Sequence, residues 1–151
     1  MEAFRKSMVA TASTVHYQQV LQLRTQGKSL GRFTHKVQDV VEASGIQTGL
    51  CSIFLRHTSA SLVIQENADP DVLLDMETFL AKLVPEGHHY IHIAEGPDDM
   101  PAHIRSVLTS TSETIPIVKG RLALGTWQGI YLWEHRTRNH TREVVVHVVG
   151  S

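Results

Sequence analysis

Two hydrophobic periods alternate along this chain, and each predicts its own kind of secondary structure. Apolar and polar residues alternate over 14–23, a period of two that is typical of a half-buried strand. Short apolar runs predict further strands over 50–57, 62–64 and 90–93. In the last third, the same reasoning predicts strands over about 112–118, 121–134 and 142–149.

Three helices are expected between these strands. One is expected to be capped by Thr34 and to stop at Gly45, a residue suited to the left-handed C-terminal position of a helix. The strongest pattern follows Asp69 and Pro70, which suit the N-cap and the first helical position. Its apolar stripe consists of Val72, Leu73, Met76, Phe79, Leu80 and Leu83. A third helix starts near Pro101, with its inward face expected at Ile104, Val107 and Leu108.

The order of these elements predicts one α+β domain with a largely antiparallel sheet packed by about three helices. Residues 1–13 form an expected N-terminal tail, and 14–151 form the domain. The strands at 50–57 and 144–149 are apolar at consecutive positions, so both are expected to be covered on both faces. The glycines and serine over 27–31 predict a loop.

Polar side chains are concentrated where the strand at 50–57 ends. The segment 56–70 changes from an apolar strand to hydroxyl, amide and carboxylate side chains and then to a helix start. Such an arrangement favours a binding site built at the end of rigid elements. The candidates that this segment supplies are Arg56, His57, Ser59, Ser61, Glu66 and Asn67.

Histidine is unusually frequent, with ten residues in the chain. His57 ends a predicted strand, His92 ends another, and His103 lies in the first turn of a predicted helix, four residues after Asp99. Three neutral imidazoles hold Zn²⁺ or a similar ion and leave one position open for water or substrate. The spacing matches no established metal motif, so a shared three-histidine site is a hypothesis at this point.

Other polar residues favour structural roles. His147 lies within a valine run and is interpreted as a core histidine, whereas His135 and His140 flank a basic turn that is expected to be solvated. Serine catalysis by Ser59 or Ser61 is disfavoured because no Gly-x-Ser-x-Gly elbow is present. Glycines beside Trp127 fit either a binding-site wall or a core tryptophan with small neighbours.

Composition narrows the class of protein. A chain of 151 residues with 42% apolar and 19% charged residues is ordinary for a globular domain, and a formal charge of −1 gives no electrostatic signature of a nucleic-acid or membrane binder. The single cysteine, Cys51, lies in an apolar run and is expected to be a buried thiol in a reducing compartment. No apolar run reaches the length of a membrane span, so a cytoplasmic protein is the expectation.

Four motifs in a fixed order resemble the YjbQ-like family, also called the secondary thiamine-phosphate synthase enzymes. The resemblance covers about residues 15–150. The motifs are His-Thr-Ser-Ala-Ser-Leu at 57–62, Glu-Asn-Ala-Asp-Pro-Asp-Val at 66–72, Glu-Gly-Pro-Asp-Asp-Met-Pro-Ala-His at 95–103 and Leu-Gly-Thr-Trp-Gln-Gly-Ile-Tyr at 124–131.

The resemblance implies a homotrimer of compact α+β chains, with the polar motifs gathered near the subunit interface. It also implies a metal at His57 and His103, and the position of His92 before the Glu-Gly-Pro-Asp loop adds a third ligand. The activity attached to the family joins a pyrimidine pyrophosphate to a thiazole phosphate, giving thiamine phosphate and pyrophosphate, as a weak or secondary activity. A magnesium-like ion held by carboxylates such as Asp98 and Asp99 would assist the departing pyrophosphate.

The leading hypothesis is therefore a metal-using enzyme that acts on a small phosphorylated substrate. His57, His92 and His103 are the expected metal ligands, and the catalytic candidates are His57, His103, Asp99 and Glu66. The substrate-binding candidates are Arg56, Ser59, Ser61, Asn67 and Trp127, with Trp127 stacking on a ring. Two alternatives remain open: a small-molecule or metal-binding module without turnover, and a metal-dependent hydrolase.

Overall fold

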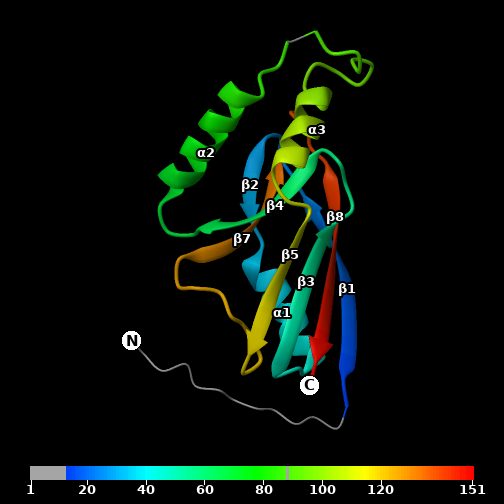
Figure 1. Ribbon diagram of the computed structural model, residues 1–151, viewed down its shortest axis with the longest axis vertical. Helices are drawn as coiled ribbons and strands as arrows, with labels where there is room; N and C mark the ends of the chain where they lie inside the picture. Colours follow the sequence, from blue (N-terminus) through cyan, green and yellow to red (C-terminus); the bar gives the residue numbers. More distant parts are fainter. Residues whose placement is uncertain (1–12, 88) are drawn as a thin grey trace.

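The chain folds into a single α+β domain with three helices and two antiparallel sheets among its described residues, as the computed structural model shows (Figure 1). The structure describes residues 13–87 and 89–151. The expected tail over 1–13 therefore falls, except for residue 13, outside the described residues. The α+β class and the antiparallel pairing predicted from the sequence are confirmed.

The larger sheet has five strands in the order β1-β8-β3-β5-β6. Strand β8 lies between β1 and β3, and its residues pair with both neighbours along most of their length. The tight turn from β5 to β6 places Lys119 and Gly120 at positive φ, which fits the turn expected there. The bounds of the five strands are β1 Val15–Arg24, β3 Thr48–Leu55, β5 Ser112–Val118, β6 Arg121–Leu122 and β8 Thr141–Gly150.

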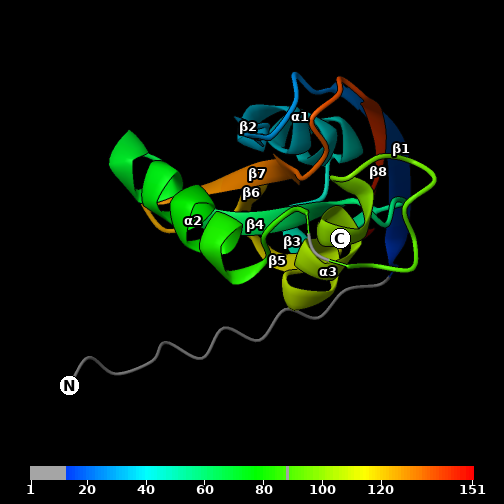
Figure 2. The same ribbon diagram turned by 90° about the horizontal axis from the view of Figure 1, so that it is seen from above.

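The smaller sheet has three strands in the order β2-β7-β4. The bounds are β2 Ser29–Arg32, β4 Ala60–Glu66 and β7 Gln128–Glu134. One face of this sheet joins the five-stranded sheet and α1 around the main core, to which β4 and β7 contribute Leu62, Ile130 and Leu132. The other face carries Trp133, which packs in a second cluster with Leu80 and Val84. Figure 2 shows α1 on one side of β4 and β7 and α3 on the other.

The three helices begin and end close to the predicted positions. Helix α1 spans Thr34–Ser44 and ends at Gly45, whose φ of 70° is the left-handed conformation that the sequence predicts. The predicted cap at Thr34 is wrong, because Phe33 holds the N-cap position and the Thr34 hydroxyl instead accepts the N–H of Ile130 on β7. Helix α2 spans Pro70–Leu83, and the Asp69 carboxylate caps it by accepting a hydrogen bond from the N–H of Asp71. Helix α3 spans Asp99–Leu108. None of the helices in the described part of the chain is long and apolar enough to cross a membrane.

Three strand predictions are wrong in detail. Residues 90–93 form no strand, and the segment between α2 and α3 is irregular. The predicted loop at 27–31 contains β2, because Ser29–Arg32 pairs with β7. The predicted strand 121–134 is two strands in different sheets, because the segment 123–127 carries the chain from β6 to β7.

Burial on both faces, expected for β3 and β8, is also wrong. The inward residues of these strands are fully buried, but Leu50 and Phe54 on β3 are about half exposed. His147 lies on the same open face as Gln18, to which its Nδ1 is hydrogen-bonded at 2.9 Å, so it is not a core histidine. No helix covers this face in the described chain, and consecutive apolar residues do not reveal whether a second layer exists.

Two helices bury different faces from those expected. Leu80 is the only residue of α2 that is buried, whereas Phe79 and Leu83 remain largely exposed. Helix α3 buries a polar face that includes Arg105 and Ser106, and its predicted inward residues Val107 and Leu108 are exposed. Arg105 Nη1 donates to the Glu77 carboxylate and Nη2 to the Val84 carbonyl, and these two bonds compensate much of the cost of burying the cation, although its Nε has no partner among the described residues.

Candidate functional site

A histidine–aspartate–histidine cluster lies where α3 begins. Asp99 Oδ2 lies 2.6 Å from His92 Nε2 and 3.1 Å from His103 Nε2. One ligand atom from each of the three residues lies within 4.8 Å of the others, which is close enough for one metal ion to reach all three. Asp99 is buried, and the two histidines are partly open to solvent. The cluster therefore combines a fixed carboxylate with two accessible imidazoles.

Helical spacing and a main-chain contact hold His103 in place. Asp99 and His103 are four residues apart on α3, so their side chains share one face of the helix. His103 Nδ1 lies 2.9 Å from the main-chain oxygen of Thr58, to which its N–H donates. This bond selects the tautomer that carries its hydrogen on Nδ1, in which Nε2 is an acceptor and faces a carboxylate oxygen that is also an acceptor. A cation bound between Nε2 and the carboxylate oxygen would satisfy both acceptors. Metal-binding histidines usually donate their other ring N–H to a carbonyl or carboxylate oxygen, as His103 donates to Thr58.

Arg136 fixes the carboxylate from its other side. Its Nη1 lies 2.7 Å from Asp99 Oδ1, and its Nε donates to Asp98 Oδ2 at 2.9 Å. A third bond from Arg136 Nη2 to the carbonyl of Glu95 ties the loop before α3 to the same guanidinium. Asp99 consequently offers Oδ2 alone to the histidine side of the cluster. Arg136 is buried, which contradicts the solvated hairpin tip expected at this turn.

The two aspartates at the start of α3 have lowered pKa values. Burial by itself raises the pKa of Asp98, but hydrogen bonds from Arg136 and from the N–H of Thr137 outweigh it and lower the pKa to about 2. Burial also opposes ionisation of Asp99, but the hydrogen bond from His92 and the charge of Arg136 lower its pKa as well. Both carboxylates are ionised at neutral pH. Asp98 Oδ2 accepts hydrogen bonds from Arg136 and from the N–H and hydroxyl of Thr137, and Asp98 is not part of the group that could hold a metal ion.

A hollow of about 380 Å³ lies beside the cluster. It is bounded by the turn between β3 and β4, by α3 and by the segment after α3. Its polar walls include His57, Thr58, His103 and Thr111. The volume suits a small molecule, and His103 lies both in the hollow and in the cluster.

His57 lies at the hollow but outside the cluster. Its Nε2 accepts the N–H of Glu143 at 2.8 Å, and its Nδ1 lies 3.5 Å from Arg142 Nη1. Burial, and then the charge of Arg142, lower the pKa of His57, so the ring is neutral at neutral pH. Of the three histidines predicted as ligands, the structure brings His92 and His103 together around Asp99 in a group that could hold a metal ion, whereas His57 lies outside this group.

The serines of the first motif are used inside the protein. Ser59 accepts hydrogen bonds from Arg142 Nη2 at both its hydroxyl and its carbonyl oxygen. Ser61 is fully buried and its hydroxyl contacts His135 Nε2 at 2.6 Å and Thr109. Burial lowers the pKa of His135 to about 3, so this histidine is a neutral core residue rather than part of a solvated turn. Neither serine presents a free hydroxyl to the hollow.

A buried ion pair between Glu134 and Arg142 holds the segments that surround the cluster. Arg142 is bonded to both carboxylate oxygens of Glu134, the residue that ends β7. Glu134 also accepts a hydrogen bond from Thr25 and the N–H groups of His135 and Arg136. Burial raises the pKa of Glu134, but these bonds, first that of Arg142, lower it overall. The same carboxylate thus fixes the turn that carries Arg136 to the aspartates.

Three predicted site residues lie at the far end of β4. Glu66 ends that strand, and seven residues of extended chain place it about 20 Å from the turn at Thr58. Asn67 donates from its amide to the carbonyls of Thr126 and Gln128, and Trp127 beside them is 63% exposed. Arg56 is exposed and pairs with Glu143. Within one chain, the expected single site is therefore divided between the two ends of the three-stranded sheet.

Sequence reasoning missed the contribution of Arg136, Glu134 and Arg142. Arg136 is expected in a solvated turn over 136–139, and Arg142 only at the start of the predicted strand 142–149. The buried Glu134 at the end of an apolar strand is the one local signal, since an isolated acid in such a strand requires a cationic partner. Its partner begins a strand of the other sheet, so spacing along the chain does not identify the pair.

Comparisons with known proteins agree with the motif resemblance. The family model described as UPF0047 protein YjbQ-like matches residues 19–151. A UPF0047 protein of Synechocystis is 64% identical over 146 residues, covering 95% of this chain and 99% of that relative. The YjbQ protein of Escherichia coli O157:H7 is 40% identical, covering 89% of this chain and 99% of that one. A crystal structure from Sulfolobus solfataricus, described as a protein of unknown function, superimposes with a TM-score of 0.85 at 25% identity, over 92% of this chain and all of that chain.

Proposed function

This chain belongs to the UPF0047/YjbQ-like family, and from that premise we propose that it is a metal-dependent enzyme whose divalent ion binds at His92, Asp99 and His103. The observation that carries the proposal is the convergence of two imidazole Nε2 atoms on one oxygen of Asp99. Two nitrogen ligands and one carboxylate oxygen suit Zn²⁺ or a similar ion. Such an ion supplies Lewis-acid stabilisation of the negative charge that develops on a phosphoryl oxygen or a leaving group.

The hollow beside the cluster supports a small phosphorylated substrate. Thr58 and Thr111 line it, and the described residues engage neither hydroxyl in a hydrogen bond, so both can donate to substrate oxygens. His57 is held neutral beside them, and because its Nε2 accepts the N–H of Glu143, its Nδ1 carries the ring hydrogen and can donate it to a substrate oxygen. Val107 adds an apolar wall. These groups would orient the substrate and exclude water from one side of it.

The first reaction to test is the one attached to the resembled family. A pyrimidine pyrophosphate is joined to a thiazole phosphate, and thiamine phosphate and pyrophosphate are released. Supporting this choice are the family membership and a histidine–aspartate cluster beside a hollow of suitable size. Product formation is measured by mass spectrometry, with His103→Ala as the inactive comparison. Phosphate release without coupling would favour a hydrolase, and metal or ligand binding without either product would favour a binding module.

Metal content is expected to follow the cluster rather than His57. Tag-free wild-type protein should contain about one zinc-like ion per chain, and His92→Ala or His103→Ala should lose it, because two remaining ligands bind weakly. His57→Ala is the matched control and should keep its metal, since His57 lies outside the group. Inductively coupled plasma mass spectrometry provides the measurement. Metal lost in His57→Ala but retained in His92→Ala would contradict the assignment.

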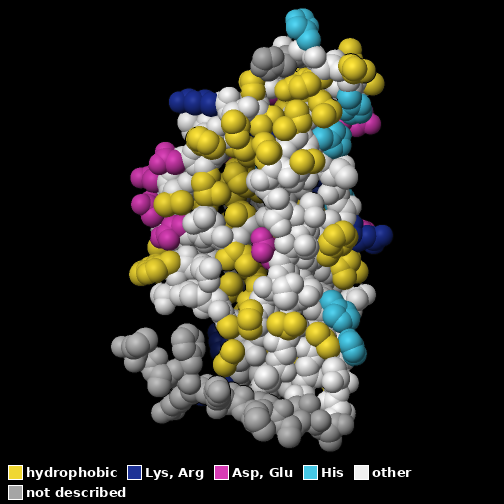
Figure 3. Space-filling model, viewed as in Figure 1, with side chains coloured by type: hydrophobic (Ala, Val, Ile, Leu, Met, Phe, Trp, Pro, Cys, Tyr) yellow, Lys and Arg dark blue, Asp and Glu magenta, His cyan; other side chains and the backbone are white. Residues whose placement is uncertain are grey.

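We also propose that three copies associate, as the family resemblance implies. Large apolar side chains stay exposed on α2 and α3, and Figure 3 displays apolar surface over both helices on one face. A surface of this kind favours contact with another protein. Association also offers a way to bring the Glu66 and Trp127 end of one chain to the histidine cluster of another, which a single chain does not achieve.

Light scattering should give a mass of about 50 kDa for three chains of 16.8 kDa. Phe79, which is 67% exposed on α2, provides the variant. Phe79→Asp should shift the mass toward 16.8 kDa without loss of fold, because a charge is costly in an apolar interface but not in water. A wild-type mass of 16.8 kDa at micromolar concentration would remove the proposal.

A further inference from the structure

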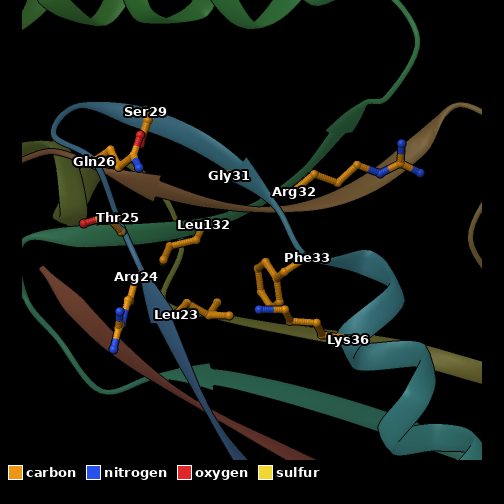
Figure 4. Close-up of a pocket in the computed structure, with 10 residues that line it drawn as sticks. All are labelled: Leu23, Arg24, Thr25, Gln26, Ser29, Gly31, Arg32, Phe33, Lys36 and Leu132. Carbon is orange, nitrogen blue, oxygen red and sulfur yellow. The ribbon is translucent and has the colours of Figure 1, made fainter. Parts of the chain in front are cut away.

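A second pocket lies at the seam between the two sheets. Strands β1 and β2 follow one another in the chain, and each is an edge strand of its own sheet. A cavity of about 330 Å³ opens between them and the start of α1 (Figure 4). We call it the seam pocket. None of the residues that line it lines the hollow at His57 and His103.

The floor of the seam pocket is rigid and apolar. Leu23, Phe33 and Leu132 are each at most 6% exposed and belong to the main core cluster. They come from β1, from the residue before α1 and from β7, so three separate elements fix their positions. A preformed apolar floor of this size suits the ring or short chain of a small molecule.

The rim of the same pocket is cationic. Arg24, Arg32 and Lys36 line it, and neither an aspartate nor a glutamate does. None of the three forms an ion pair with any described residue, in a chain whose formal charge is −1. In Figure 4 the Lys36 amine lies beside the Phe33 ring, while the two guanidinium groups extend to opposite sides. Positive charge is therefore concentrated here without internal compensation.

We propose that the seam pocket binds a small organic anion, a phosphate monoester carried on a flat apolar group. The ring or chain lies on the floor formed by Leu23, Phe33 and Leu132, and the phosphate accepts a hydrogen bond from Lys36, while Arg24 and Arg32 contribute positive charge at the rim. The Gln26 amide, which also lines the pocket, provides a further donor. This proposal is independent of the metal cluster and of the reaction assigned to it.

Gly31 keeps the seam pocket open. It pairs directly with Leu132, so a side chain at position 31 would extend from the same face of the sheet as Leu132. A Cβ at this position would meet only the Leu132 oxygen, at 4.0 Å, an ordinary contact. A leucine at position 31 is therefore tolerated by the backbone and fills the cavity without changing any charge.

Binding is tested by titrating deuterated, ¹⁵N-labelled protein with phenyl phosphate and following backbone amide shifts. Saturable shifts confined to residues around 23–36 and 132 are expected. Lys36→Gln should weaken binding roughly tenfold, the size of one lost charge-assisted hydrogen bond. Gly31→Leu should weaken it at least as much by occupying the floor. Lys82→Gln, which removes an exposed lysine of α2, is the matched control and should bind as the wild type does.

Several outcomes overturn the proposal. If phenol bound as tightly as phenyl phosphate, the cations would not contribute to binding. If inorganic phosphate bound as tightly as phenyl phosphate, the apolar floor would not contribute. Shifts spread over the surface, or unchanged affinity in both Lys36→Gln and Gly31→Leu, would place the ligand elsewhere. Because metal content is measured separately, loss of this site leaves the metal assignment intact, and loss of the metal site leaves this one intact.

Discussion

Replacing Arg142 by methionine is expected to lower the free energy of unfolding by about 3–5 kcal/mol. Methionine fills much of the arginine volume but leaves the Glu134 carboxylate, which is 0% exposed, without its cationic partner. Ser59 also loses the hydrogen bonds that fix its carbonyl and hydroxyl. Urea denaturation at one fixed protein concentration provides the measurement, since association makes stability concentration-dependent.

Two further variants test whether the loss of stability comes from leaving a buried charge unpaired or simply from breaking an ion pair. Arg56→Met breaks the exposed pair with Glu143 and should change stability by no more than about 1 kcal/mol. Adding Glu134→Leu to Arg142→Met removes the buried charge itself and should recover much of the loss. A loss of equal size in Arg56→Met, or no recovery in the double variant, would contradict this account of the ion pair.

The difference in stability between the wild type and Arg142→Met should depend on pH in a direction that the pKa of Glu134 determines. The folded pKa of Glu134 lies below its ordinary value, so its contribution is present above the ordinary pKa of about 4.5 and is lost as the pH falls toward the folded value. Asp98, with a folded pKa of about 2, adds a second loss between about pH 4 and pH 2. The stability gap between wild type and Arg142→Met should therefore narrow in acid, because the unpaired carboxylate in the variant becomes protonated.

Asp99→Asn is expected to weaken zinc binding by at least about 100-fold, measured by isothermal titration calorimetry. Outer contacts to a metal ligand typically change affinity by about 10–100-fold, and Asp99 is assigned here as a ligand itself. The asparagine amide is nearly isosteric with the carboxylate, but it lacks the negative charge that attracts the zinc ion. Asp99 is buried and supplies the only carboxylate of the group, so no other residue of the group can replace its charged oxygen.

Asp98→Asn is the control that distinguishes coordination from loop geometry. Asp98 shares Arg136 with Asp99 and is equally buried, but its Oδ2 is occupied by Arg136 and Thr137. The Asp98→Asn protein should lose stability and keep most of its zinc affinity. If both variants lose zinc equally, Arg136 and the loop before α3 determine the site, and Asp99 is not the ligand.

Local sequence signals predicted the elements that depend on neighbouring residues. The helix caps at Gly45 and Asp69 form as expected, because a cap requires only a few residues of chain in the right conformation. The period-two pattern of β1 was equally informative. At 90–93 the local signal failed, since a strand forms only where a partner edge lies alongside, and none does there.

The sequence by itself determined the family, the α+β class and the presence of His92, Asp99 and His103 in motifs that point to metal chemistry. Only the tertiary structure decided that Asp99, rather than His57, joins the two histidines, because the contact depends on how α3 packs beside the turn at Thr58. It also decided that Glu134 and Arg142 meet across two sheets and that Arg136 is buried against the aspartates. Arg136 lies tens of residues from the aspartates in the chain, and Glu134 and Arg142 lie on strands of different sheets, so neither pairing follows a periodic pattern and both depend on packing rather than on local sequence.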